Sequence, residues 1–134
     1  MDIVVSQAHG RVPVTVFQIT GAIISDEPLV AQAQQAFADG MRDLLLDLTA
    51  VPYMSSQGLR ALHTIYTLLR TDAPDESDEA VKHGIRAGTF TSPHLKLLNP
   101  SPKVLEVLHM TGYDMFLDIY QDRSAAIAAF GGAP

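Results

Sequence analysis

The sequence contains no cysteine among its 134 residues. This absence excludes disulfide bonds, thiolate metal ligands and cysteine nucleophiles. Basic residues are also scarce, because nine Lys and Arg stand against fifteen Asp and Glu and leave a net charge of -6. A chain without a basic stripe is a poor match for a phosphate backbone, so we expect no binding to nucleic acid.

Long apolar runs and closely spaced metal ligands are missing too. No stretch approaches the ~18 consecutive apolar residues that a membrane span needs. The N-terminal segment carries Asp2 and no basic region, unlike a secretory signal. The histidines lie too far apart for an HxxxH or HExxH motif; they are His9, His63, His83, His94 and His109. We therefore expect a cytoplasmic protein with no membrane span, no metal site and no cofactor.

Strand-like and helical patterns alternate along the rest of the chain. Apolar runs typical of strands cover residues 3–6, 12–20, 44–48, 95–98 and 116–120. Helical spacing follows start signals at 25–28, 55–58, 101–102 and 122. The continuous apolar run at 44–48 indicates a central strand buried on both faces. We predict a single α/β domain, with a mixed sheet of about five strands covered by about four helices.

One segment interrupts this alternation. Residues 71–92 separate the second predicted helix from the fourth strand, and they begin with TDAPDESDEA, which holds five acids and no base. Most of the net negative charge of the chain is therefore local to these ten residues. Long structureless loops inside compact domains are uncommon, and runs of like charge are usually solvated. We expect an acidic, mobile insertion at 71–92.

The most informative stretch is residues 44–62, LLLDLTAVPYMSSQGLRAL. A buried strand ends in Asp47, a short connection follows, and a helix opens at Ser55 and Ser56. These two hydroxyls stand where the first backbone N–H groups of a helix have no intrahelical partner. One serine can act as the N-cap, which contributes about 1 kcal/mol. Alternatively, a phosphoryl group here would add ~1.5–2 negative charges at the positive end of the helix. The spacing leaves both interpretations open.

This strand–loop–helix pattern resembles the STAS domain family, whose best-known members are bacterial anti-sigma factor antagonists. The resemblance extends over most of the chain. Residues 14–21 are similar to the second strand of the family, which ends in glycine. Residues 101–116 are similar to the helix and the glycine-aromatic turn that precede its last strand.

The resemblance implies a phosphorylation site and a partner switch. In the family the loop reads Asp-Ser-Ser/Thr/Ala-Gly-Leu, and alignment on Gly58 and Leu59 places the phosphoacceptor at Ser56. Ser55 occupies the aspartate position and is the second candidate. Unmodified protein is then expected to bind a serine kinase that is also the anti-sigma factor. Phosphorylation weakens that complex, and a metal-dependent serine phosphatase restores it.

The expected contact surface surrounds the start of this helix and includes the loop after the second strand. Its predicted residues are Tyr53, Met54, Ser55, Ser56, Gln57, Gly58, Arg60, Gly21, Ser25 and Asp26. Tyr53 and Met54 are candidates for an exposed apolar anchor, since a few such residues dominate many interfaces. The alternative is that both pack beneath the loop.

Two other functions are alternatives to the switch. A catalytic triad of Ser56, His63 and Asp47 is disfavoured, because His63 lies seven residues along the same helix, a rise of about 10 Å. We therefore expect no enzyme. A STAS adaptor that is not phosphorylated, in a stress-sensing scaffold or a lipid-transport complex, would use the same helix and stays open. Nothing in the sequence indicates an oligomeric state.

Overall fold

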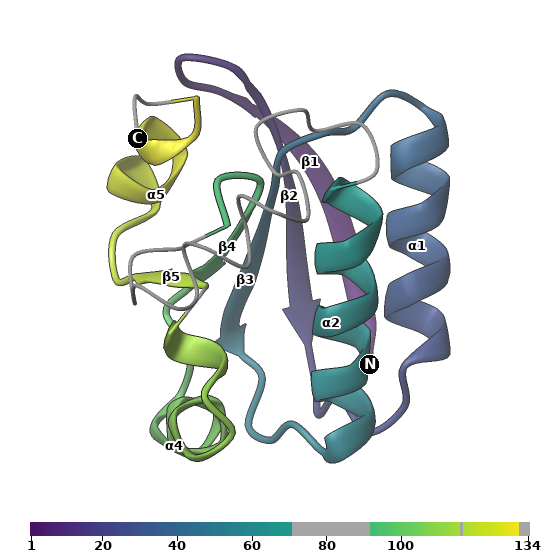
Figure 1. The fold of residues 1–134 in the computed structure, drawn as a ribbon, viewed down its shortest axis with the longest axis vertical. Helices are drawn as coiled ribbons and strands as arrows, with labels where there is room; N and C mark the ends of the chain where they lie inside the picture. The colour runs from purple at the N-terminus through teal and green to yellow at the C-terminus, as the bar shows by residue number, and fades with distance from the viewer. Residues whose placement is uncertain (71–91, 116, 132–134) are drawn as a thin grey trace.

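The computed structural model describes residues 1–70, 92–115 and 117–131 (Figure 1). Its strands are β1 (Asp2–His9), β2 (Pro13–Thr20), β3 (Leu44–Ala50), β4 (Leu95–Leu98) and β5 (Asp118–Tyr120). Its helices are α1 (Glu27–Ala38), α2 (Ser56–Arg70), α4 (Pro102–Met110), the short 3-10 helix η2 (Tyr113–Met115) and α5 (Arg123–Ala129). The acidic insertion predicted at 71–92 lies outside the described residues, except for Ser92, which is buried.

The strands form one five-stranded sheet in the order β1-β2-β3-β4-β5. β1 and β2 are an antiparallel hairpin, and every later neighbour pairs in parallel. Parallel neighbours need crossover connections, which helices provide. The predicted mixed sheet covered by helices is therefore confirmed.

Helices cover both faces of this sheet. On one face α1 and α2 lie side by side (Figure 1), and their apolar residues form the main core with Phe17 and Leu46. On the other face α5 contributes Ala126 and Phe130 to a smaller core that includes Leu45. Successive strand residues point to opposite faces. The apolar run of β3 is thus continuous because both faces of this strand are buried, as predicted.

The observed boundaries differ from the predicted ones at four of the five strands; β2 begins one residue later and β3 continues two residues further, to Ala50. The first strand continues to His9, which pairs with Pro13, because hairpin pairing with β2 extends past the apolar part of the sequence. The last strand contains only Asp118–Tyr120, because the Leu117 N–H donates back to the Tyr113 carbonyl oxygen of η2 at 3.1 Å instead of joining the sheet; residue 116 lies outside the described residues. Pro13 stands at the first position of its strand, where its missing N–H is tolerated.

Several helix signals act as the sequence suggests. Ser101 Oγ accepts a hydrogen bond from the Val104 N–H at 3.4 Å, and an Asp122 carboxylate oxygen accepts one from the Ala125 N–H at 3.0 Å. Gly112 follows α4 with a φ of 79°, the left-handed conformation that glycine adopts easily. Asp26 occupies the N-cap position of α1 without a side-chain cap bond.

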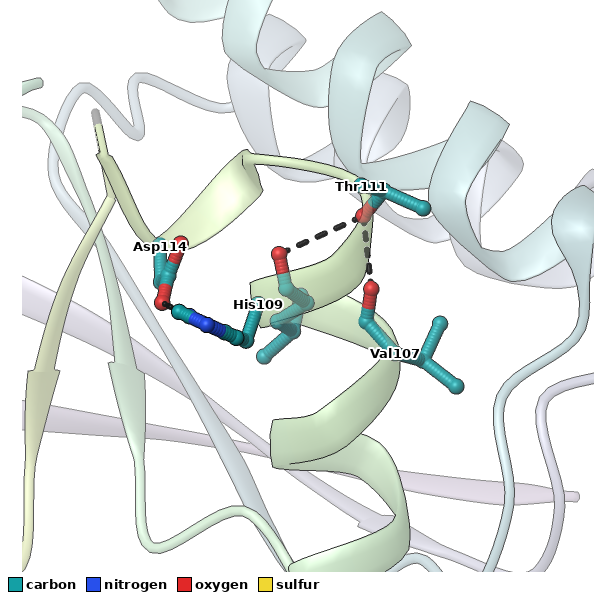
Figure 2. A network of polar contacts seen from close by, with 5 residues as sticks. Val107, His109, Thr111 and Asp114 are labelled. Carbon is teal, nitrogen blue, oxygen red and sulfur yellow. Dashed lines mark hydrogen bonds and ion pairs between the residues drawn. The ribbon is translucent and has the colours of Figure 1, made fainter.

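Polar contacts close the end of α4 (Figure 2). The Thr111 hydroxyl donates at 2.7 Å to the Val107 carbonyl oxygen, which also accepts a hydrogen bond from the Thr111 N–H at 3.1 Å. His109 Nδ1 lies 2.9 Å from an Asp114 carboxylate oxygen of η2. These contacts connect α4 to the turn that leads into β5.

Lys96 of β4 is a buried charge on the α5 face. Its side chain is 5% exposed, and its Nζ lies 3.2 Å from an Asp118 carboxylate oxygen of β5. The ammonium also lies 5.4 Å from the centre of the Phe130 ring and 5.9 Å from that of Tyr120. Burial raises the pKa of Tyr120, and the nearby Asp118 carboxylate raises it further.

The two partners of this ion pair should respond differently to substitution. Lys96→Met removes the buried charge and leaves Asp118 half-exposed to water, so stability should change by less than about 1 kcal/mol. Asp118→Asn leaves the buried ammonium without its carboxylate and should cost more than about 1 kcal/mol. Urea unfolding of both variants measures the difference. A larger loss for Lys96→Met than for Asp118→Asn would contradict this account.

Candidate functional site

Two loops lie paired at the ends of β2 and β3. The Ile23 N–H donates to the Tyr53 carbonyl oxygen at 3.0 Å, and the Ser55 N–H donates to the Ile23 carbonyl oxygen at 2.9 Å. Together these bonds form an isolated parallel bridge between Ile23 and Met54. The Gly21 N–H also donates to the Ala50 carbonyl oxygen at 3.1 Å. The connection from β3 to α2 is therefore fixed against the loop after β2.

This pairing separates inward from outward side chains. Ile23 and Met54 are buried, the latter with 1% exposure, whereas Ile24 is 65% exposed and Tyr53 46% exposed. Extended segments point successive side chains to opposite sides. The expectation that Met54 forms an exposed anchor with Tyr53 is therefore wrong, because Met54 fills the core beneath the loop. Ile24 is the exposed apolar neighbour that the sequence analysis missed.

Gly58 allows α2 to begin close to this bridge. A Cβ atom at position 58 would lie 2.5 Å from Met54 Cγ and 3.0 Å from the Ile23 carbonyl oxygen. Distances this short require the loop or the helix to move. Gly58 was predicted to be part of the contact surface, but it is buried. It lets α2 begin close to the loops that form this surface.

The two serines at the start of α2 have different surroundings. Ser55 Oγ accepts hydrogen bonds from the Gln57 N–H at 3.2 Å and from the Gly58 N–H at 3.4 Å. Ser55 is therefore the N-cap. Ser56 is the first residue of α2, and its side chain is exposed. Among the described residues no hydrogen bond from the Ser56 hydroxyl is found.

The other predicted contact residues lie on the same two segments. Gln57 and Arg60 are exposed on the first turns of α2, and Arg60 is on the same helix face as Ser56 because four residues separate them. Ser25 is exposed and Asp26 half-buried just before α1. These polar side chains border the exposed Ile24 and Tyr53 segments.

Asp47 has a structural role within β3. Its Oδ1 accepts hydrogen bonds from the Thr49 N–H at 3.0 Å and from the Thr49 hydroxyl at 2.6 Å. The Asn99 side-chain amide donates to the Thr49 hydroxyl oxygen at 3.3 Å, which ties the end of β4 to β3. His63 is exposed on α2, and its ring centre lies 6.3 Å from that of Tyr66. These contacts involve neither Ser56 nor a base for it.

Within residues 1–70, 92–115 and 117–131, no group of three or more His, Cys, Asp or Glu side chains is placed to hold a metal ion. No helix in this described part of the chain is both long enough and apolar enough to span a membrane.

The close approach at Gly58 gives a stability prediction. Alanine is a better helix former by about 1 kcal/mol, but its Cβ would overlap Met54 and the Ile23 backbone. Gly58→Ala should therefore destabilise the protein by about 1–3 kcal/mol, as overpacking does. The control Gln57→Ala changes an exposed neighbour and should lie within about 0.5 kcal/mol of wild type. If urea unfolding finds Gly58→Ala as stable as Gln57→Ala, the loop does not need the glycine.

Comparisons with solved structures show similar folds. An anti-sigma factor antagonist from Mycobacterium paratuberculosis superposes with a TM-score of 0.71 at 22% identity, covering 98% of this chain and 94% of that one. The anti-sigma factor antagonist SpoIIAA in its unphosphorylated form gives 0.58 at 14% identity, with 93% of each chain covered. The Bacillus SpoIIAA in its phosphorylated form gives 0.61 at 16% identity, covering 93% of this chain and 96% of that one.

A search among curated proteins gave no significant match. The sequence model of the STAS domain, in contrast, matches residues 5–73, which is half of the chain. The matched region runs from β1 through α2 and contains the paired loops and both candidate serines. The chain belongs to the STAS domain family.

Proposed function

We propose that this STAS protein is an anti-sigma factor antagonist whose binding to a serine kinase/anti-sigma factor is switched by phosphorylation of Ser56. The observation that carries the proposal is the exposed Ser56 hydroxyl at the start of α2, while Ser55 performs the capping. The fold likeness to SpoIIAA, a protein known in unphosphorylated and phosphorylated forms, supports the same role.

The surroundings of Ser56 suit a reversible phosphate. The positive end of the α2 dipole favours a negative group at this position. Arg60 lies one turn further on the same face, where its guanidinium can pair with a phosphate. The Ser56 side chain is exposed and supports no packing, so the fold does not depend on an unmodified hydroxyl. We therefore expect the phosphorylated protein to keep its structure.

The same phosphate would weaken a packed complex. Ile24 and Tyr53 supply exposed apolar surface on the paired loops next to Ser56. A partner that covers these side chains would also remove water from the Ser56 hydroxyl. Phosphorylation would then place about two negative charges in a desolvated contact. To change the ratio of free to bound protein from 1:99 to 99:1, phosphorylation would have to weaken the binding free energy by ~5.5 kcal/mol. A metal-dependent serine phosphatase would reverse the change.

Phosphorylation by candidate anti-sigma kinases and ATP, followed by peptide mass spectrometry, tests the acceptor. We expect one phosphate on the wild type, mapped to Ser56, and none on Ser56→Ala. Ser55→Ala should still be phosphorylated, although loss of the cap should lower its stability by about 1 kcal/mol. It therefore serves as the matched control for a neighbouring hydroxyl.

Two results would contradict the proposal. A phosphate that persists in Ser56→Ala would move the acceptor to another residue. A kinase that binds the protein stably but never phosphorylates it would favour the adaptor alternative, in which the same helix is a permanent contact.

A further inference from the structure

β1 forms one edge of the sheet along its whole length. It pairs with β2 from Asp2, opposite Thr20, to His9, opposite Pro13, without a register shift. Among the described strands none pairs with its outer side. An unpaired edge presents a row of backbone N–H and C=O groups that can bond to another strand.

The hairpin shows which residues of β1 face outward. The Gly10 N–H donates to the Val12 carbonyl oxygen at 3.2 Å, in the same register as the rest of the hairpin. Hydrogen-bonded pairs alternate in an antiparallel ladder. The even-numbered residues of β1 therefore bond to β2, and the odd-numbered residues direct their backbone groups to the free edge. These outward-facing residues are Ile3, Val5, Gln7 and His9.

This edge lacks the features that usually prevent edge pairing. β1 is eight residues long and contains no lysine, no proline and no bulge. Val4 is 58% exposed and Val5 40% exposed, on opposite faces of the strand. The other edge strand, β5, has only three residues. Short edges, lysines, prolines and bulges are the ordinary means of protection, and β1 has none of them.

A cleft of about 560 Å³ lies beside this edge, between β1 and the end of α1. Several polar side chains in its walls already have hydrogen-bond partners. The Gln35 side-chain amide donates to Asp39 at 3.3 Å, and the Arg42 guanidinium donates to the Met41 carbonyl oxygen at 2.7 Å. The Thr15 hydroxyl donates to Gln7 at 3.3 Å. The outward backbone groups of β1 have no partner strand among the described strands, so a strand fits this place better than a small polar ligand.

We propose that β1 pairs antiparallel with β1 of a second copy of this chain, forming a two-fold dimer with a continuous sheet. The distribution of charge along the strand supports antiparallel pairing with a second copy. The strand begins at Asp2 and leads at its other end to His9 and Arg11. Antiparallel pairing sets the acidic start of each copy near the basic end of the other, whereas parallel pairing would set like charges together.

Symmetry and the outward-facing residues determine the register. A two-fold axis perpendicular to the sheet keeps the α1 faces of both copies on the same side, so opposed residues must share a face. Centring the axis on Ser6 pairs every outward-facing residue: Ile3 meets His9 of the second copy, and Val5 meets Gln7 of the second copy. The exposed Val4 then lies opposite Ala8 of the second copy and is covered.

Single cysteines test this arrangement because the natural chain has none. In the predicted register two Ser6 residues form a non-hydrogen-bonded pair with Cα atoms about 4.5 Å apart, within the range for a disulfide. Two Val4 residues would lie about 13 Å apart along the strands. We expect wild type to sediment as a dimer, Ser6→Cys to form a covalent dimer on oxidation, and the matched control Val4→Cys to form none.

A third variant removes one outward-facing donor. Val5→Pro deletes an N–H that does not bond to β2 and should convert the dimer to a monomer with an unchanged circular dichroism spectrum. Monomeric wild type at the highest soluble concentration would overturn the proposal. A dimer that cross-links through Val4→Cys but not Ser6→Cys would overturn the register, and a folded Val5→Pro that stays dimeric would exclude β1 as the interface.

Discussion

The pairing of Ile23 with Met54 determines where each exposed residue of the site lies. Two backbone hydrogen bonds join the loops, and both side chains are buried below them. Gly58 lets α2 begin directly against this pair. These contacts therefore fix the backbone that carries Ser56, Tyr53 and Ile24. A surface arranged in advance loses less conformational entropy on binding than a mobile loop would.

Ser55 caps α2 and Ser56 is exposed, a distinction that the sequence alone does not make. Aspartate and serine are both good N-caps, so Ser55 can replace the aspartate of the family motif and still bind the first N–H groups of α2. The exchange removes a negative charge next to Ser56 without removing the cap. This departure from the motif therefore lowers the negative charge beside Ser56 and preserves the start of α2.

Local patterns predicted much of the fold, because the contacts involved are close in sequence. Ser101 and Asp122 cap the helices that follow them, and the apolar run of β3 is buried on both faces. Long-range contacts were not predictable in this way. Met54 is buried because it pairs with Ile23 of a distant loop. The same pairing turns Ile24 outward, although two adjacent isoleucines after Gly21 were an available signal. Lys96 is buried because β5 and α5 close over it.

Calorimetric titration of the serine kinase/anti-sigma factor with unmodified and Ser56-phosphorylated protein tests the central claim most directly. Ser124→Asp, which adds a charge at the exposed start of α5, is the control for charge elsewhere. The account predicts at least a tenfold weaker complex for the phosphorylated protein, about 1.4 kcal/mol, with an unchanged melting temperature and with Ser124→Asp binding like wild type. Equal affinities for the unmodified and phosphorylated proteins would contradict it.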